Sequence, residues 1–139
     1  MVYAGLGALA AAGLAGCDPR FVRHSDLRPA EIQALAGTWQ GEGALSFSNA
    51  SDCTRVYLWT LRVKDGNVDG EIVDRRTPYA PHARFTSFVD YDGSVHATLN
   101  AYGRDTEVLG TFGRDSFTGT ARSKGCNYAV HLHYVAGTQ

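Results

Sequence analysis

The sequence has no excess of charge of either sign and no apolar run of transmembrane length. Its 13 Lys and Arg residues face 14 Asp and Glu, which gives a net charge of -1 at pH 7. This balance argues against a nucleic-acid partner, because phosphate binding calls for a basic patch. The uncharged run at residues 2–16 is shorter than the roughly 20 apolar residues of a membrane-spanning helix. Only four prolines accompany 16 glycines, and their spacing indicates turns rather than disorder.

The motifs of common catalytic sites are also missing. The chain has no G-x-S-x-G elbow, no H-E-x-x-H pair and no Walker loop, which mark hydrolases, zinc proteases and nucleotide-binding proteins. We therefore predict that the protein is not an enzyme and has no cofactor. The weak candidates for a metal site are His131 and His133, which point the same way if they lie on one strand. Both alternate with core-like residues, so we expect two solvent-facing histidines and no metal.

The uncharged run ends in the letters LAGC at residues 14–17, and polar chain follows directly. The length of the run and its small residues are typical of the apolar part of a secretory signal peptide. The four residues resemble the lipobox of bacterial lipoproteins, in which the cysteine is lipidated and the signal is removed before it. The resemblance implies a signal peptide over residues 1–16, a lipid on Cys17 and a tether over residues 17–27. A buried N-terminal helix with a chance cysteine is the alternative.

Lipidation has a consequence for location. Each buried methylene contributes about 0.8 kcal/mol, and two or more acyl chains hold a protein stably on a membrane. We therefore expect a protein of the bacterial cell envelope, with a membrane as its partner through Cys17, that faces the periplasm or the exterior. The remaining residues, 28–139, are enough for one domain.

Two cysteines, Cys53 and Cys126, remain after Cys17 is assigned to lipid. An even number of cysteines in an oxidising compartment predicts a disulfide. A metal site is the alternative, but it needs more ligands near the cysteines than the sequence provides, and no C-x-x-C motif is present.

The rest of the chain predicts one short helix and then strands. In residues 28–37, Pro29 suits the first helical turn and Gly37 suits the position after the last one. Apolar and polar residues then alternate between turn signals. The expected strands are Trp39–Phe47, Cys53–Val63, Val68–Val73, Arg84–Tyr91, Val95–Ala101, Glu107–Phe112, Ser116–Arg122 and Cys126–Val135. This pattern is typical of an all-β, antiparallel up-and-down barrel of eight strands, and a β-sandwich is the alternative.

The inward positions of these strands carry both large and small residues. Among the large ones are Phe47, Tyr57, Trp59, Phe85, Tyr91, Phe117, Tyr128 and Tyr134. An eight-stranded barrel is just wide enough to be filled by side chains or to hold one small ligand. Small residues at Gly41, Gly43, Gly70, Ala97 and Gly119 leave room for such a ligand. We expect an interior that is mostly filled.

The start of the first strand carries a family resemblance. A short helix followed by LAGTW at residues 35–39 looks like the opening of calycins such as lipocalins, in which the tryptophan plugs one end of the barrel. The resemblance implies this role for Gly37 and Trp39, and the alternation of their strands predicts that Trp59 and Tyr128 lie in the core. In this sequence no arginine follows the last strand to pack on the tryptophan. Arg28 and Arg122 are the candidates for packing there instead.

The spacing of glycines and cysteines is also similar to that of small disulfide-bearing domains of the bacterial envelope. The shared motifs are G-x-W-x-G at residues 37–41, Cys53, the glycine-rich turns and a final strand that begins at Cys126. A more distant likeness is to metalloprotease inhibitors of Gram-negative bacteria, which are eight-stranded barrels.

Two functions follow as hypotheses. The first is a non-catalytic, membrane-anchored envelope lipoprotein that acts through its surface as a structural or protein-binding module, including a protease-inhibitor-like one. The second is a lipocalin-like carrier of a small apolar ligand.

Overall fold

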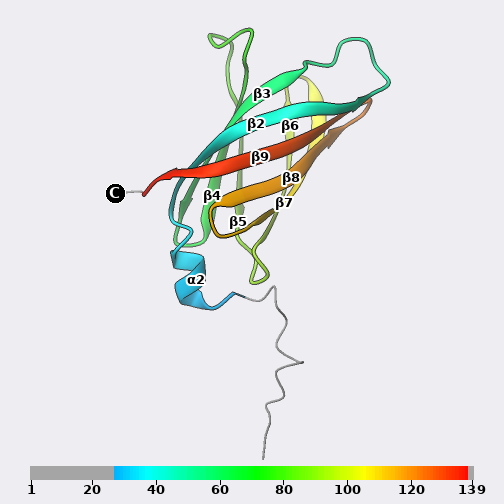
Figure 1. The fold of residues 1–139 in the computed structure, drawn as a ribbon. Helices are drawn as coiled ribbons and strands as arrows, with labels where there is room; N and C mark the ends of the chain where they lie inside the picture. The colour runs from blue at the N-terminus through cyan, green and yellow to red at the C-terminus, as the bar shows by residue number, and fades with distance from the viewer. Residues whose placement is uncertain (1–26, 138–139) are drawn as a thin grey trace, which may run out of the picture.

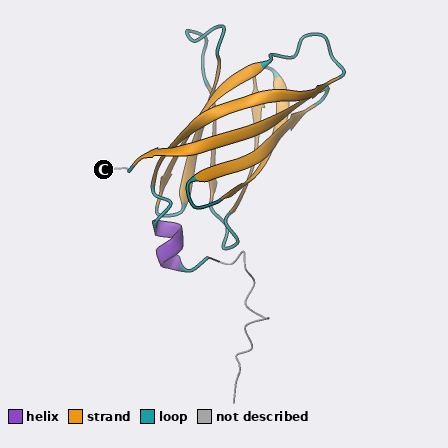
Figure 2. Ribbon diagram, in the orientation of Figure 1, coloured by secondary structure: helices purple, strands orange, loops and turns teal. Residues whose placement is uncertain are grey.

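The computed structural model describes residues 27–137, so the predicted signal peptide, Cys17 and the tether up to residue 26 lie outside the described residues. It contains a short helix and eight strands, as Figures 1 and 2 show. The helix is α2 (Pro29–Gln33), and the strands are β2 (Gly37–Ser48), β3 (Val56–Lys64), β4 (Asn67–Asp74), β5 (Ala83–Phe88), β6 (Ser94–Ala101), β7 (Arg104–Phe112), β8 (Ser116–Ser123) and β9 (Cys126–Ala136).

The eight strands form one antiparallel sheet that curls into a nearly closed barrel (Figure 1). Their order is β5-β4-β3-β2-β9-β8-β7-β6, so the first strand pairs with the last and every other pair is sequential. No backbone ladder joins β5 to β6 in the part of the chain that the structure describes. The Ser87 hydroxyl instead donates a hydrogen bond to the His96 carbonyl oxygen across this seam, at 2.7 Å. The predicted up-and-down barrel is confirmed, and one continuous sheet excludes the sandwich.

The turns use the expected chemistry. Asp65 and Gly66 have positive φ angles of 52° and 79°, which is the type I′ geometry that the Asp-Gly pair predicts for a two-residue hairpin. Tyr102 and Gly103 form a second turn with the same signs, at 55° and 86°.

Helix α2 begins as predicted and ends earlier than predicted. Pro29 occupies the first helical turn, and the Arg28 backbone N–H donates to the Glu31 carboxylate at 2.9 Å. The helix ends at Gln33, so Gly37 does not follow its last turn and the role that we expected for it there is wrong. Gly37 is the first residue of β2 instead, and its φ of 143° favours glycine because that region is rarely open to other residues.

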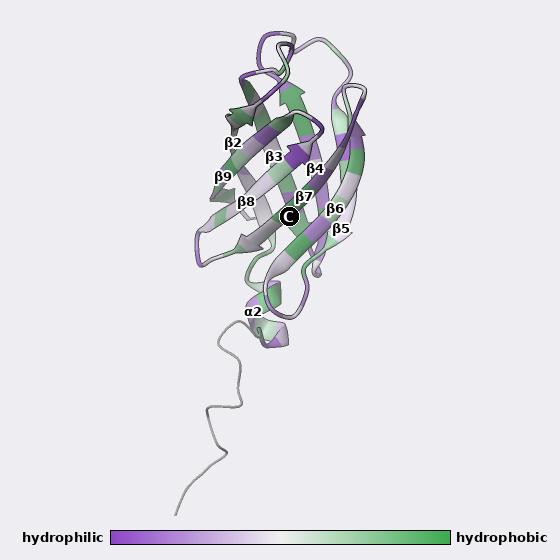
Figure 3. Ribbon diagram, turned by 90° about the vertical axis from the view of Figure 1, so that its right-hand side faces the viewer, coloured by the Kyte–Doolittle hydropathy of each residue, from purple (hydrophilic) through white to green (hydrophobic). Residues whose placement is uncertain are grey.

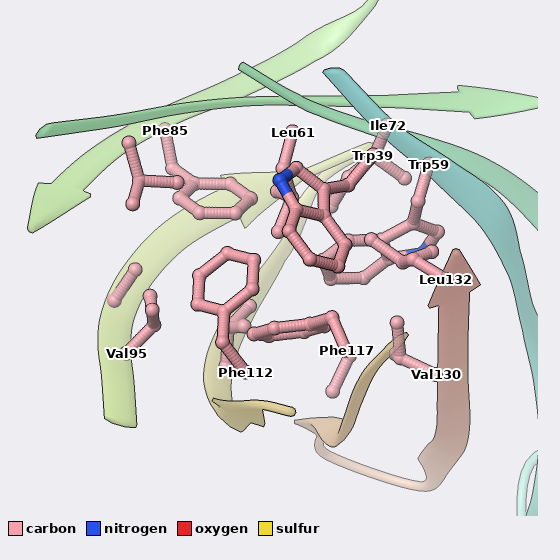
Figure 4. Packing of buried hydrophobic residues seen from close by; sticks show 14 of the residues in the cluster. Trp39, Trp59, Leu61, Ile72, Phe85, Val95, Phe112, Phe117, Val130 and Leu132 are labelled. Atoms are coloured by element: carbon pink, nitrogen blue, oxygen red, sulfur yellow. The ribbon is translucent and has the colours of Figure 1, made fainter. Parts of the chain in front are cut away.

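The inward faces of all eight strands meet in one hydrophobic core. Hydrophobic and hydrophilic positions alternate along the strands in Figure 3, and Figure 4 shows the inward side chains packed together. The buried residues of the core include Trp39, Trp59, Leu61, Val63, Val68, Ile72, Phe85, Val95, Val108, Phe112, Phe117, Tyr128, Val130 and Leu132. The core positions predicted for Trp39, Trp59 and Tyr128 are therefore confirmed.

Three aromatic residues that we expected to point inward are exposed. A register shift between Leu45 and Phe47 in the pairing of β2 with β9 turns Phe47 outward, because one extra residue reverses the alternation of a strand. Tyr91 is 60% exposed since β5 already ends at Phe88. Tyr134 lies near the end of β9, where the side chain is only partly covered.

Glycines make room for aromatic rings inside the barrel. A Cβ atom on Gly43 would lie 2.6 Å from the Trp59 indole nitrogen. On Gly70 or Gly110 it would lie 2.2 Å from the ring of Phe85 or Phe117, respectively. The rings therefore fill the space above these glycines, and the alternative that small inward residues leave a ligand cavity is not supported at these positions.

Candidate functional site

One end of the barrel is closed by Trp39 together with α2. The Trp39 indole N–H donates to the Leu35 carbonyl oxygen at 3.0 Å, just after the helix. Its ring meets Phe112 and Tyr134 edge-on, with ring centroids 4.8 and 5.2 Å apart. Leu35, just after the helix, is part of the core, and Ile32 packs against the core from α2.

Neither arginine that we considered for packing on Trp39 lies there. The Arg28 side chain is 85% exposed and contacts Glu31. Arg122 lies near the end of β8 that leads to the disulfide, and this is the opposite end of the barrel. The Tyr134 ring covers Trp39 instead.

The opposite end carries the predicted disulfide between Cys53 and Cys126, whose Cα atoms are 5.7 Å apart. Cys126 begins β9 and pairs with Ser48, the last residue of β2. We expected Cys53 to begin a strand, but β3 begins at Val56 and Cys53 lies in the segment before it. The bridge passes beyond the end of β2, where the Ser48 hydroxyl donates to Cys53 Sγ at 3.2 Å. It thereby links β9 to the segment that leads into β3, and these two strands flank β2.

Three tyrosines cover the barrel interior at this disulfide end, which we call the mouth. Tyr57 stacks on Tyr102 with ring centroids 5.6 Å apart and meets Tyr128 edge-on at 5.2 Å. The Tyr128 hydroxyl donates to the Thr54 carbonyl oxygen at 2.7 Å. Burial, with a smaller contribution from Tyr57, raises the pKa of the Tyr128 phenol well above its ordinary value. This phenol therefore stays protonated and serves as a hydrogen-bond donor.

The space under these rings is too small for an organic ligand. About 20 Å³ remains between side chains that include Tyr57, Trp59, Thr106 and Tyr128, which is room for about one water molecule. The Trp59 indole N–H, packed against Gly43, has no hydrogen-bond partner among the described residues. The prediction of a mostly filled interior is confirmed.

A buried carboxylate organises one side of the mouth. Asp74 is 8% exposed, and its carboxylate accepts hydrogen bonds from the Thr54 hydroxyl at 3.1 Å and the Arg76 backbone N–H at 2.9 Å. Burial opposes ionisation of Asp74, but these bonds and the Arg76 guanidinium outweigh it, so the pKa of the carboxyl lies below its ordinary value. The Tyr102 hydroxyl donates to the Ile72 carbonyl oxygen at 3.1 Å and accepts from the Asp74 backbone N–H at 3.3 Å. The network satisfies its polar groups internally.

The segment between β4 and β5, residues 75–82, projects beyond the strand ends at the mouth (Figure 1). The Arg75 guanidinium contacts the Glu42 carboxylate on β2. At the other end of the segment His82 contacts Glu71, and this hydrogen bond together with Arg84 and Arg62 holds the pKa of Glu71 below its ordinary value. Tyr79, at the tip, is 99% exposed.

The two candidate metal ligands face solvent. His131 and His133 both lie on the outer face of β9, and Glu42 and Gln40 lie opposite them on β2. No three His, Cys, Asp or Glu side chains within residues 27–137 come close enough to hold a metal ion. His96 lies on β6, apart from this pair, with Nε2 3.1 Å from the Glu107 carboxylate.

Sequence reasoning missed the polar residues of the mouth. Thr54, Asp74 and Tyr102 come from three separate segments, and only the barrel brings them together. Pro78 and Pro81, which lie on either side of Tyr79, indicate a loop. The sequence does not show, however, that the Tyr79 ring is fully exposed.

Comparison of the chain with protein-family models and with curated proteins finds no match in either set. No helix within residues 27–137 has both the length and the apolar character needed to cross a bilayer.

Proposed function

We propose that this protein is a non-catalytic lipoprotein of the bacterial envelope, anchored through Cys17, that acts through its outer surface as a structural or protein-binding module. The observation that supports this function best is the filled interior. Trp59, Phe85 and Phe117 occupy the space above the inward glycines, and only about 20 Å³ is left near the mouth. Because the barrel interior has no room for a ligand, we expect the protein to bind its partners through its outer surface.

The position of Leu27 gives the anchored protein an orientation. The Leu27 backbone N–H donates to the Tyr91 carbonyl oxygen at 2.5 Å, in the turn between β5 and β6 at the closed end. Leu27 is ten residues after Cys17, and ten residues of extended chain span at most about 35 Å. A lipid on Cys17 therefore keeps the closed end within this distance of the membrane, and we propose that the mouth faces away from it. The mouth loops become the part of the surface that other envelope proteins meet first.

The mouth chemistry also favours binding over catalysis. The Thr54 hydroxyl donates to the Asp74 carboxylate, and because the pKa of this carboxyl lies below its ordinary value, the carboxylate is a weak base for activating a nucleophile. The Tyr128 phenol is held in its protonated form by burial. Both groups complete the fold of the rim.

The lipid anchor is tested by metabolic labelling. Cells that express the full chain receive a clickable fatty acid, and the wild type and a Cys17→Ala variant are compared after membrane fractionation. We expect label and membrane retention for the wild type and neither for the variant. A wild type that stays unlabelled contradicts the anchor, whatever its location.

The competing carrier function is tested by melting. A bound ligand stabilises by RT ln(1 + [L]/Kd), which is about 2.7 kcal/mol at a hundredfold excess over Kd. We expect a panel of fatty acids and apolar dyes to leave the melting temperature of the full chain unchanged. A saturable rise with one compound shows that the interior opens and favours the carrier.

A further inference from the structure

The most exposed aromatic residue of the described chain lies in a turn between β4 and β5. Tyr79 is 99% exposed, although burying an aromatic ring is one of the larger sources of stability for a fold. Pro78 and Pro81 lie on either side of it. The Ala80 backbone N–H donates to the Thr77 carbonyl oxygen at 3.0 Å, so Tyr79 occupies the tip of a tight turn.

The base of this turn is held from several directions. The Thr77 backbone N–H donates to the Asp74 carbonyl oxygen at 3.0 Å, and the Arg76 guanidinium donates to the Thr54 hydroxyl at 3.1 Å. On the other side, the His82 ring lies 3.4 Å from the Pro78 carbonyl oxygen. A ring on a held turn binds without the entropy loss of ordering a flexible loop.

Two of the three arginines around the turn are far more exposed than the carboxylates they contact, whereas Arg75 and its partner Glu42 are exposed to a similar extent. Residues 75–84 contain three arginines and no Asp or Glu. The side chains of Arg76 and Arg84 are 69% and 68% exposed, whereas those of their partners Asp74 and Glu71 are only 11% and 14% exposed. An approaching molecule therefore meets guanidinium groups before it meets the carboxylates behind them.

We infer that the Tyr79 turn, residues 75–82, docks an acidic protein surface that has an apolar pocket for one aromatic ring. Tyrosine and arginine are, with tryptophan, the residue types enriched among the side chains that contribute most binding energy at protein interfaces. A protease cleft is a poor fit because substrate-like loops bind in extended form, whereas this segment is a closed turn. The inference rests on the proposed function and specifies which surface and which partner chemistry that function uses.

The test places a photo-crosslinking amino acid at position 79 of the full chain in the cell envelope. The matched control is position 88, because Phe88 is also an exposed aromatic residue, at 62%, but lies near the closed end. We expect a protein product from position 79 and none from position 88. Mapping the product should place the crosslink beside Asp and Glu side chains of the partner.

Binding of the purified partner then provides the quantitative check. Tyr79→Ala should weaken binding at least tenfold and leave melting unchanged, because the ring makes no buried contact. Tyr79→Phe should weaken it far less, and Phe88→Ala should not change it. Raising the salt concentration should weaken binding, since exposed charge pairs are screened.

The other outcomes separate the two proposals. A protein product from position 88 alone, or equally from both positions, overturns the docking turn but leaves a protein-binding function in place. A lipid product from position 79 overturns the turn as a protein site. A mapped contact without acidic residues, with binding that salt does not alter, overturns the partner chemistry. No protein product at either position contradicts protein binding itself.

Discussion

The pairing of glycines with aromatic rings can be tested by a double-mutant cycle at Gly70 and Phe85. These residues lie directly opposite each other on β4 and β5, and a Cβ atom on Gly70 would lie 2.2 Å from the Cε1 and Cζ atoms of Phe85. Gly70→Ala must therefore displace a buried ring that also contacts Trp59 at 6.0 Å between centroids. Overpacking of this kind costs about 1–3 kcal/mol.

The second variant removes the clashing atoms. Phe85→Ala removes the whole ring, including Cε1, Cζ and the Cδ1 atom that would lie 2.7 Å from the new Cβ, so in this background the methyl group of Gly70→Ala has space. The substitution should then be neutral or stabilising by up to about 1 kcal/mol, because alanine loses less backbone entropy than glycine in a strand. The coupling between the two changes should be about 1–3 kcal/mol.

The assay is urea unfolding of the disulfide-bonded protein, with the free energy of unfolding taken from midpoints at constant m. Gly113→Ala is the control, because the nearest atom to its new Cβ is 3.4 Å away, and it should add to Phe85→Ala without coupling. If Gly70→Ala costs the same in both backgrounds, within about 0.5 kcal/mol, the ring does not fill this space and our account of the interior is wrong.

Three further predictions concern the mouth. Replacing Cys53 and Cys126 together by alanine should lower the free energy of unfolding by about 4 kcal/mol, because the bridge closes a separation of 73 residues; chemical denaturation checks this, and a loss under about 1 kcal/mol contradicts it. Asp74→Asn should destabilise the protein at neutral pH, because the lowered pKa of Asp74 makes its ionised form stabilising above the unfolded-state value of about 3.9. The difference should shrink as pH falls through the folded-state pKa, and a constant difference from pH 7 to pH 2 argues against ionisation as the cause. Tyr102→Phe should cost about 1–2 kcal/mol, since the hydroxyl bonds to both Ile72 and Asp74; an unchanged midpoint means that these bonds contribute no net stability.

The local pattern of the sequence was enough to predict the strands and their order. Period-two alternation identifies an inward face for each strand, and short turns allow only neighbours in the chain to pair, which leaves an up-and-down barrel. The disulfide followed from the even number of cysteines left after Cys17. Errors came where local rules stop applying, as at Phe47, where a register shift that no residue type announces reverses the alternation.

Only the tertiary structure decided what the barrel encloses and what its mouth presents. The same inward glycines fit an empty cavity or a filled one, and the choice depends on whether rings from the neighbouring strand lie over them, as Phe85 lies over Gly70. Asp74 and Thr54 are 20 positions apart in the chain, yet they share a hydrogen bond. Packing and hydrogen bonding act between residues that are close in space, whereas sequence periodicity reports only on neighbours along the chain.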